Sequence, residues 1–219
     1  MEGNATQERI IATAKQLFRE KGYHAMRVSD ISRILGISKG NLTYYYPTKN
    51  SLISSLFDRY FDAIDRYIDN ARLPVEHFYS RELYTSLIGD INILSDPQIR
   101  HFYGELINEP VQWEIIRKTS LRQIRTLHAH DCVVATAQEL DYFAEGMAGA
   151  YNAIDKMFIA RGEPDNMEAI YTHVTLKQIA RAQFWTVHRV DTNVQDTRDS
   201  IVRHVKTLRN RDFSRILLL

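Results

Sequence analysis

Apolar residues recur at helical spacing along nearly the whole chain, and no strand-like alternation interrupts them. The first two stripes are Ile10, Ala14, Leu17 and Phe18, then Val28, Ile31, Ile34 and Leu35. A longer stripe crosses residues 48–72 and consists of Leu52, Leu56, Phe57, Tyr60, Phe61, Ile64, Tyr67 and Ile68. The pattern predicts an all-α protein in which one long helix joins the N-terminal region to the rest.

Cap and turn residues divide the remainder into further helices. The breaks combine such residues with a helix-disfavouring step, at Asp96-Pro97, Glu109-Pro110, Gly162-Glu163-Pro164 and Asp191-Thr192. We expect helices over residues 75–94, 97–108, 111–130, 134–161, 165–188 and 193–217. We also expect a head over residues 1–49 and a larger helical domain over residues 50–219.

Residues 28–52 have the pattern of a helix-turn-helix followed at once by the long helix. Gly36 can adopt the positive φ that ends one helix, and Ser38 can cap the next. On that short helix Leu42 and Tyr46, four residues apart, are spaced to face the core. The opposite face carries Lys39, Gly40, Thr43 and Tyr44. A cation, a glycine and two hydroxyl groups suit the major groove of DNA.

Charge is distributed unevenly, although the chain as a whole carries only +1. Residues 1–49 hold eight basic and four acidic residues, a net charge of +4. The other 170 residues hold 20 basic and 23 acidic ones, a net charge of −3. The cation excess coincides with the helix-turn-helix, as attraction to phosphate requires.

A known family matches closely in three places: Gly36-Ile37-Ser38-Lys39-Gly40-Asn41-Leu42, Tyr45-Tyr46-Pro47-Thr48-Lys49, and Leu52. Here the chain resembles the tetracycline-repressor (TetR) family of bacterial transcription regulators. The resemblance covers about residues 5–55. It implies a three-helix DNA-binding head, a larger domain for ligand binding and dimerisation, and double-stranded operator DNA as partner.

The resemblance and the helical geometry together suggest which residues contact DNA. Lys39, Gly40 and Thr43 are expected at base edges, and Asn41, Tyr44, Tyr45 and Lys49 at phosphates. The chain departs from the family in two positions. Arg27 stands where the family has a capping threonine, so Arg27 is expected to reach a phosphate or Ser29 to supply part of the cap. Thr43 stands where the family usually has a tyrosine, so base contacts cannot be copied wholesale.

Polar-tipped aromatic residues interrupt the apolar stripes of the larger domain. Such stripes form the core in most proteins, but each buried polar tip needs a partner. The family resemblance implies an inducer pocket among these helices. Its candidate residues are Tyr84, Tyr103, Trp113, Phe143, Met147 and Tyr151. Since they lack a concentrated charge, we expect a mainly apolar or aromatic effector.

Small residues lie on one face of the helix expected at 134–161, namely Gly146, Gly149, Ala150 and Ala153. Each glycine in a helix costs about 1 kcal/mol relative to alanine, so a close contact must compensate. A helix of the same subunit can supply that contact. The resemblance favours a partner subunit, and hence a homodimer.

The remaining features exclude other classes of protein. No apolar run reaches the length of a membrane span and no signal-peptide layout is present, so we expect a cytoplasmic protein. A single cysteine, Cys132, excludes an intrachain disulfide and any multi-cysteine metal site. His128 and His130 would point apart on a helix, so we expect no metal there.

Three functions compete on the sequence alone. The first is a homodimeric repressor released from a palindromic operator by a small effector. The second is a helix-turn-helix regulator controlled by a protein partner instead. The third, a helical enzyme, lacks a phosphate-binding loop, a His-Glu-x-x-His motif and a nucleophile elbow. We therefore expect no catalytic activity and no cofactor.

Overall fold

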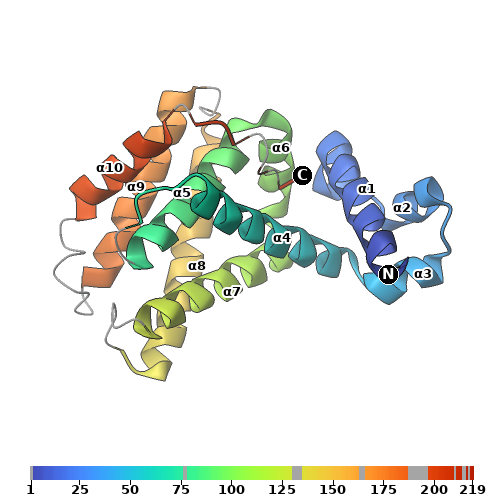
Figure 1. Cartoon of the computed structure of the whole chain (residues 1–219), viewed down its shortest axis with the longest axis horizontal. Coiled ribbons are helices and arrows are strands. Elements are labelled where there is room, and N and C mark those ends of the chain that lie inside the picture. Colours follow the sequence, from blue (N-terminus) through green and yellow to red (C-terminus); the bar gives the residue numbers. More distant parts are fainter. Residues whose placement is uncertain are drawn as a thin grey trace.

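The computed structural model describes residues 2–75, 78–129, 135–162, 166–186, 197–209, 211–213, 216, 218 and 219. These residues form helices and no strand, which confirms the predicted all-α class (Figure 1). The helices are α1 (Glu2–Ala25), α2 (Val28–Leu35), α3 (Lys39–Tyr45), α4 (Lys49–Asn70), α5 (Phe78–Ser95), α6 (Pro97–Leu106), α7 (Pro110–Ala129), α8 (Ala137–Ala160), α9 (Met167–Thr186) and α10 (Thr197–Leu208).

Helices α1 to α3 form the head at one end of the molecule, drawn in blue in Figure 1. Gly36 ends α2 in the left-handed region, at φ 64°, and turns the chain toward α3. The Asn41 backbone N–H then donates to Ser38 Oγ at 3.1 Å, which caps α3. Leu42 and Tyr46 are buried, as their spacing predicts. The sequence therefore predicts the helix-turn-helix correctly.

Helix α4 leaves the head and runs into the larger domain, where it packs on α5 and α7 (Figure 1). Thr48 caps it, and Thr48 and Ser51 exchange side-chain and backbone hydrogen bonds in a capping box. Its buried residues keep the helical period from the head into the body: Leu52, Ile53, Leu56, Phe57, Tyr60, Ile64 and Ile68. One helix is therefore part of both cores.

A second contact between head and body is made by α1 and α6. The Phe18 and Phe102 rings meet with centroids 5.1 Å apart. At the edge, Arg19 Nη2 donates to Asp96 Oδ2 at 2.6 Å, and the His24 backbone N–H donates to Glu105 Oε2 at 2.9 Å. The head is thus held by α4 and, independently, by this α1–α6 joint.

Helices α5 to α10 form the body. Helix α7 packs along α8, while α5 packs on α9 and both contact α10. The buried apolar side chains of head and body form one continuous cluster. Within the described residues, no helix has the length and apolar character needed to cross a membrane.

The prediction of a helix over 193–217 is wrong at its C-terminal end. Helix α10 stops at Leu208, and the described residues beyond Arg209 are not helical. Asn92 Nδ2 donates to the carbonyl oxygens of Phe213, at 3.2 Å, and Ile216, at 2.6 Å, while both side chains are buried. Since tertiary contacts satisfy these groups, the apolar spacing there does not require a helix.

Candidate functional site

The outer face of α3 is available for contact with a large partner. Lys39, Gly40, Asn41 and Tyr44 are exposed, and Tyr44 is 81% exposed. An aromatic side chain this exposed leaves most of its ring open to a partner. The surface therefore presents a cation and an aromatic ring on a short, capped helix.

Thr43 and Tyr45 complete this face and are half-buried. Thr43 Oγ1 lies 3.0 Å from the Lys39 carbonyl oxygen and 3.2 Å from that of Gly40, so its proton is used within the helix. Its methyl group and oxygen lone pairs are then what Thr43 can offer a partner. The Tyr44 and Tyr45 rings meet edge to face, with centroids 5.1 Å apart.

Helix α2 begins without a side-chain cap, as the departure at Arg27 suggested. Arg27 occupies the N-cap position, and its exposed side chain makes no capping bond. Ser29 is exposed on the first turn. Asp30 accepts from Lys21 and Arg33, both at 2.8 Å, and the Lys21 hydrogen bond lowers the pKa of Asp30. Two of the head's cations are therefore neutralised locally, whereas Arg27 and Lys39 have exposed side chains.

Lys49 lies elsewhere than the sequence suggested. Its ammonium donates to the carbonyl oxygens of Tyr23 and Met26, the second at 3.0 Å, and stands 4.1 Å from the centroid of the Tyr23 ring. Burial lowers the pKa of Lys49. The side chain therefore ties α4 to the turn between α1 and α2, which is a structural role that a phosphate-contact prediction did not include.

A cavity of about 90 Å³ lies inside the body, between α4, α5, α6, α7, α8 and α9. One side is apolar and is formed by Phe57, Phe61, Ile93, Ile115 and Ile116. The cavity adjoins a groove of about 110 Å³ between α4 and α7, which shares Phe57, Phe61, Ile115 and Thr119 with it. The same four side chains therefore border both the cavity and the groove.

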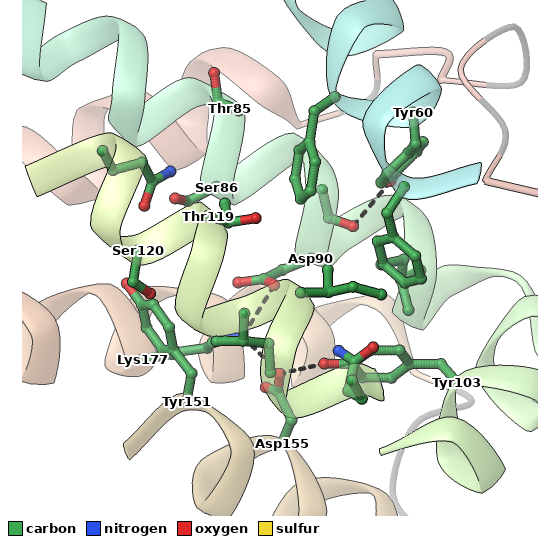
Figure 2. A pocket seen from close by; sticks show the side chains of 18 of the residues that line it. Tyr60, Thr85, Ser86, Asp90, Tyr103, Thr119, Ser120, Tyr151, Asp155 and Lys177 are labelled. Atoms are coloured by element: carbon green, nitrogen blue, oxygen red, sulfur yellow. Dashed lines mark hydrogen bonds and ion pairs between the residues drawn. The ribbon is translucent and has the colours of Figure 1, made fainter. Parts of the chain in front are cut away.

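The floor of the cavity is a buried charged cluster, shown in Figure 2. Lys177 Nζ donates to Asp155 Oδ2 at 2.7 Å and to Asp90 Oδ1 at 2.9 Å. Tyr103 donates its hydroxyl to the same Asp155 Oδ2 at 3.0 Å, and His173 Nε2 lies 3.1 Å from Asp155 Oδ1. These side chains come from four helices, α5, α6, α8 and α9.

Burial and pairing set the protonation of this cluster. Burial works against an ionised Asp155, but Lys177 and His173 outweigh it and lower the pKa of Asp155. Burial likewise opposes a charged Lys177, yet Asp155 and Asp90 together raise the pKa of Lys177. For Asp90 burial prevails over Lys177 and raises the pKa. Asp155 and Lys177 therefore form the stable ion pair, and Asp90 is the weaker partner.

Several polar atoms around the cavity are buried and have no hydrogen-bond partner within the described part of the chain. They are Asp90 Oδ2, Gln112 Oε1, Tyr151 Oη and Gln178 Nε2, and all four residues line the cavity. Unpaired buried polar groups are uncommon in folded proteins because each costs desolvation free energy. Their concentration here is typical of a site that a polar ligand or water completes.

The predicted ligand residues separate into two groups. Tyr103 and Tyr151 line the cavity, whereas Tyr84, Trp113, Phe143 and Met147 do not. Tyr84 stacks against His204 instead, with centroids 4.5 Å apart, and Phe143 and Met147 are buried on α8. The charges Asp90, Asp155 and Lys177 were missed. Their signal was a charged residue within an otherwise apolar stripe, as Asp90 is between Ile88 and Ile91.

The small-residue face of α8 has two parts. Gly149 packs inside the subunit, because a Cβ on it would lie 3.5 Å from Trp113 Cη2. Gly146 and Ala153 are exposed and Ala150 is half-buried. The exposed part continues into Tyr142, 73% exposed, and Met157, 47% exposed. Leu176 on α9 is also exposed, at 56%. The possible metal residues His130 and Cys132 lie outside the described residues.

The head presents an exposed helix-turn-helix face, and α4 continues from this head into a body that contains a cavity. This arrangement is typical of helix-turn-helix DNA-binding regulators. Residues 10–56 match the family described as "Bacterial regulatory proteins, tetR family". This match covers the N-terminal head, where the resemblance was predicted, so the head is similar to those of this family. The whole-chain fold agrees with that of solved TetR-family structures.

Individual relatives match either the head alone or the whole chain. The regulator YuxN of Bacillus subtilis is 42% identical over 53 residues, which are 24% of this chain and 18% of YuxN. EthR of Mycolicibacterium smegmatis is 25% identical over 194 residues, 81% of this chain and 87% of EthR. The crystal structure of RolR in complex with resorcinol superposes with a TM-score of 0.58 at 15% identity, covering 92% of this chain and 95% of RolR.

Proposed function

We propose that this protein is a homodimeric transcription regulator that binds a near-palindromic operator and leaves it when a small molecule enters the cavity. One observation carries the proposal. The helix that begins at the head, α4, also supplies Phe57, Tyr60 and Phe61 to the cavity wall. A ligand that moves this wall therefore acts on the element that holds the head.

The effect of the ligand depends on its preference between two states. To shift a population from 1:99 to 99:1, it must bind the released state more tightly by about 5.5 kcal/mol. The cavity is small in the present state, so a ring-sized ligand gains most from a state in which α4 and α7 stand further apart. Such a ligand disfavours the closer spacing of α4 and α7 in the present structure.

The head binds DNA through α3 in this proposal. Lys39, Gly40 and Thr43 face base edges, while Arg27, Asn41, Tyr44 and Tyr45 contact phosphates, with Ser29 beside them. Lys49 acts indirectly, because its bonds to the Tyr23 and Met26 carbonyl groups fix the turn that positions α2. One head offers little surface, so two heads are needed at half-sites about 34 to 36 Å apart.

The two subunits meet, in this proposal, on the exposed part of the α8 face. Tyr142, Gly146, Ala150, Ala153 and Met157 follow one another at helical spacing. Leu176 extends this surface onto α9. Exposed large apolar side chains next to small ones suit a close helix-to-helix contact between copies.

The effector has an apolar or aromatic body and at least one polar group. The apolar walls support the first part, and the unpaired polar atoms of the floor support the second. The premise that the lining lacks concentrated charge is wrong, because Asp90, Asp155 and Lys177 lie there. RolR, whose fold is similar, has been crystallised with resorcinol, a small ring with two hydroxyl groups.

The proposal is tested with an operator selected from random DNA and read by fluorescence anisotropy. Resorcinol and related phenols should weaken binding of the wild-type protein. Tyr151→Phe removes one unpaired hydroxyl from the cavity and should reduce this response at least fivefold, with ligand-free operator affinity unchanged. Tyr171→Phe, which changes a buried tyrosine on α9 that does not line the cavity, is the matched control. If only a protease-sensitive fraction of cell extract released the operator, control by a protein partner would replace this proposal.

A further inference from the structure

We propose that Asp90 selects the effector, so that the cavity takes a small neutral molecule whose hydroxyl group donates to Asp90 Oδ2, and rejects molecules that carry a carboxylate. This inference rests on the proposed ligand-binding role of the cavity and names the class of ligand. The inference depends on which polar atoms of the cavity floor already have hydrogen-bond partners.

The two oxygens of Asp90 are in different situations. Oδ1 accepts from Lys177 at 2.9 Å, whereas Oδ2 is buried and has no partner among the residues that the structure describes. Asp90 is on the cavity wall, and Figure 2 shows its carboxylate above the bond to Lys177. A buried carboxylate oxygen can only accept while the group is ionised, so the missing partner is a hydrogen-bond donor.

The two carboxylate oxygens of Asp155, by contrast, both have hydrogen-bond partners. Asp155 Oδ2 accepts from Lys177 and Tyr103, and Asp155 Oδ1 has His173 Nε2 at 3.1 Å. Lys177 is shared between the Asp90 and Asp155 carboxylates, so its single ammonium group does not neutralise both of them. A ligand carboxylate would bring a third negative charge to this enclosed site and would leave Asp90 Oδ2 unpaired. Anionic ligands are therefore disfavoured.

A cationic ligand is disfavoured by the positions of the chain's own cations. Lys177 Nζ already holds the other oxygen of Asp90, and it stands 4.9 Å from the centroid of the Tyr151 ring. Arg181 Cζ lies 5.7 Å from the same centroid. An ammonium placed between Asp90 and the Tyr151 ring would therefore join two cations that already face this ring, where the dielectric screening is weak.

A neutral hydroxyl group avoids the repulsion that a charged ligand of either sign would meet, and it can still donate to Asp90. It donates its proton to Asp90 Oδ2 and keeps lone pairs that can accept from Tyr151 Oη or Gln178 Nε2, both unpaired and both on the wall. Its carbon body lies against the Phe57, Phe61 and Ile115 side. An apolar cavity of about 150 Å³ holds benzene, so the present space of about 90 Å³ takes a single ring once α4 and α7 stand further apart, as proposed above.

The test uses four single-ring probes that differ in one group: phenol, anisole, benzoate and benzylamine. Dissociation constants are measured by calorimetry with the full chain at pH 7.5. The wild-type protein should bind phenol at least about tenfold more tightly than each of the other three, because only phenol supplies a neutral donor. Asp90→Asn places an amide donor where Oδ2 accepted, so its preference for phenol over anisole and benzoate should fall at least about tenfold. Asp62→Asn, on the exposed face of α4, should keep the wild-type ranking.

Three results would overturn the inference. Anisole or benzoate could bind the wild-type protein as tightly as phenol, Asp90→Asn could keep the wild-type ranking, or the wild-type protein could bind none of the probes. The order in which the four probes bind is measured on the wild-type protein alone. This part of the test therefore holds even where Asp90→Asn fails to fold. The expected ranking without any effect of phenol on operator binding would refute the regulatory proposal and leave the role of Asp90 intact.

Discussion

Replacing Lys177 by methionine should destabilise the protein by about 3 to 5 kcal/mol at pH 7.5, because it removes one partner of a buried ion pair. Methionine keeps the length of the side chain but leaves Asp90 and Asp155 without their shared cation. Both ammonium bonds, at 2.7 and 2.9 Å, are lost. Lys177 and Asp155 are almost fully buried, so water cannot replace those bonds without rearrangement.

The loss of stability in Lys177→Met relative to the wild-type protein should shrink as pH falls. In the wild-type protein Lys177 and His173 lower the pKa of Asp155 against the effect of burial, so Asp155 stabilises the fold above its unfolded value of about 3.9. That stabilisation is lost only as pH falls through the lower folded value. Without Lys177, burial raises the pKa of both carboxyl groups, and the folded state then binds more protons than the unfolded state. Stability of the variant therefore decreases as pH rises, by about 1.4 kcal/mol per unit of raised pKa.

The measurement is urea unfolding of both proteins at pH 5.0 and 7.5, at one fixed protomer concentration because the proposed dimerisation would contribute to stability. Burial already raises the pKa of Asp90 in the wild-type protein, so the quantity compared is the difference between variant and wild type at each pH. Lys118→Met, which breaks the exposed Lys118–Asp58 pair, is the control and should cost less than about 1 kcal/mol. A Lys177→Met deficit below about 1 kcal/mol at pH 7.5, or one that does not shrink at pH 5.0, would refute this reasoning.

Three further predictions concern the head and the subunit contact. Thr43→Ala should shift base preference at one operator position by about 1 to 3 kcal/mol, while Thr43→Val, which keeps the methyl, should retain it; selection from random DNA that gives both variants one motif would exclude a methyl contact. Gly22→Ala should cost about 1 to 3 kcal/mol in thermal unfolding, because Gly22 has φ 77° and a Cβ there would lie 2.6 Å from Glu105 Oε2. Gly36→Ala, at φ 64° with nothing within 4 Å, should cost only about 1 kcal/mol, and equal losses at both glycines would contradict the steric argument. Ala150→Arg should give a folded monomer by sedimentation with specific DNA binding lost; an intact, folded dimer would place the seam on another face.

The head was predictable because its signals are local. Gly36, Ser38 and Thr48 each act on the backbone within three or four residues, so the sequence alone places the ends of α2, α3 and α4. The side chain of Lys49 was not predictable in the same way. Its partners, the carbonyl groups of Tyr23 and Met26, are more than twenty residues away and meet it only once α4 packs on the head.

The cavity was predictable only in part, because its floor is assembled from separate helices. Tyr103 and Tyr151 could be chosen as polar-tipped aromatic residues on apolar stripes. The bonds that join Asp90, Asp155 and Lys177 depend on the relative rotation of α5, α8 and α9, which spacing within one helix does not specify. The same limit explains Trp113, which packs on Gly149 rather than on a ligand.

The α1–α6 joint has a consequence for how the sensitivity of such a regulator is set. Its outer contacts, Arg19 with Asp96 and His24 with Glu105, are partly exposed polar pairs, each of which contributes about 1 kcal/mol or less. Single substitutions there would change the resting balance between head orientations by up to about fivefold without altering the cavity or α3. The effector concentration needed for a response could therefore change while the identity of the effector and the DNA sequence that is bound stay the same. Because ions screen such pairs, this effector concentration should also depend on the salt concentration.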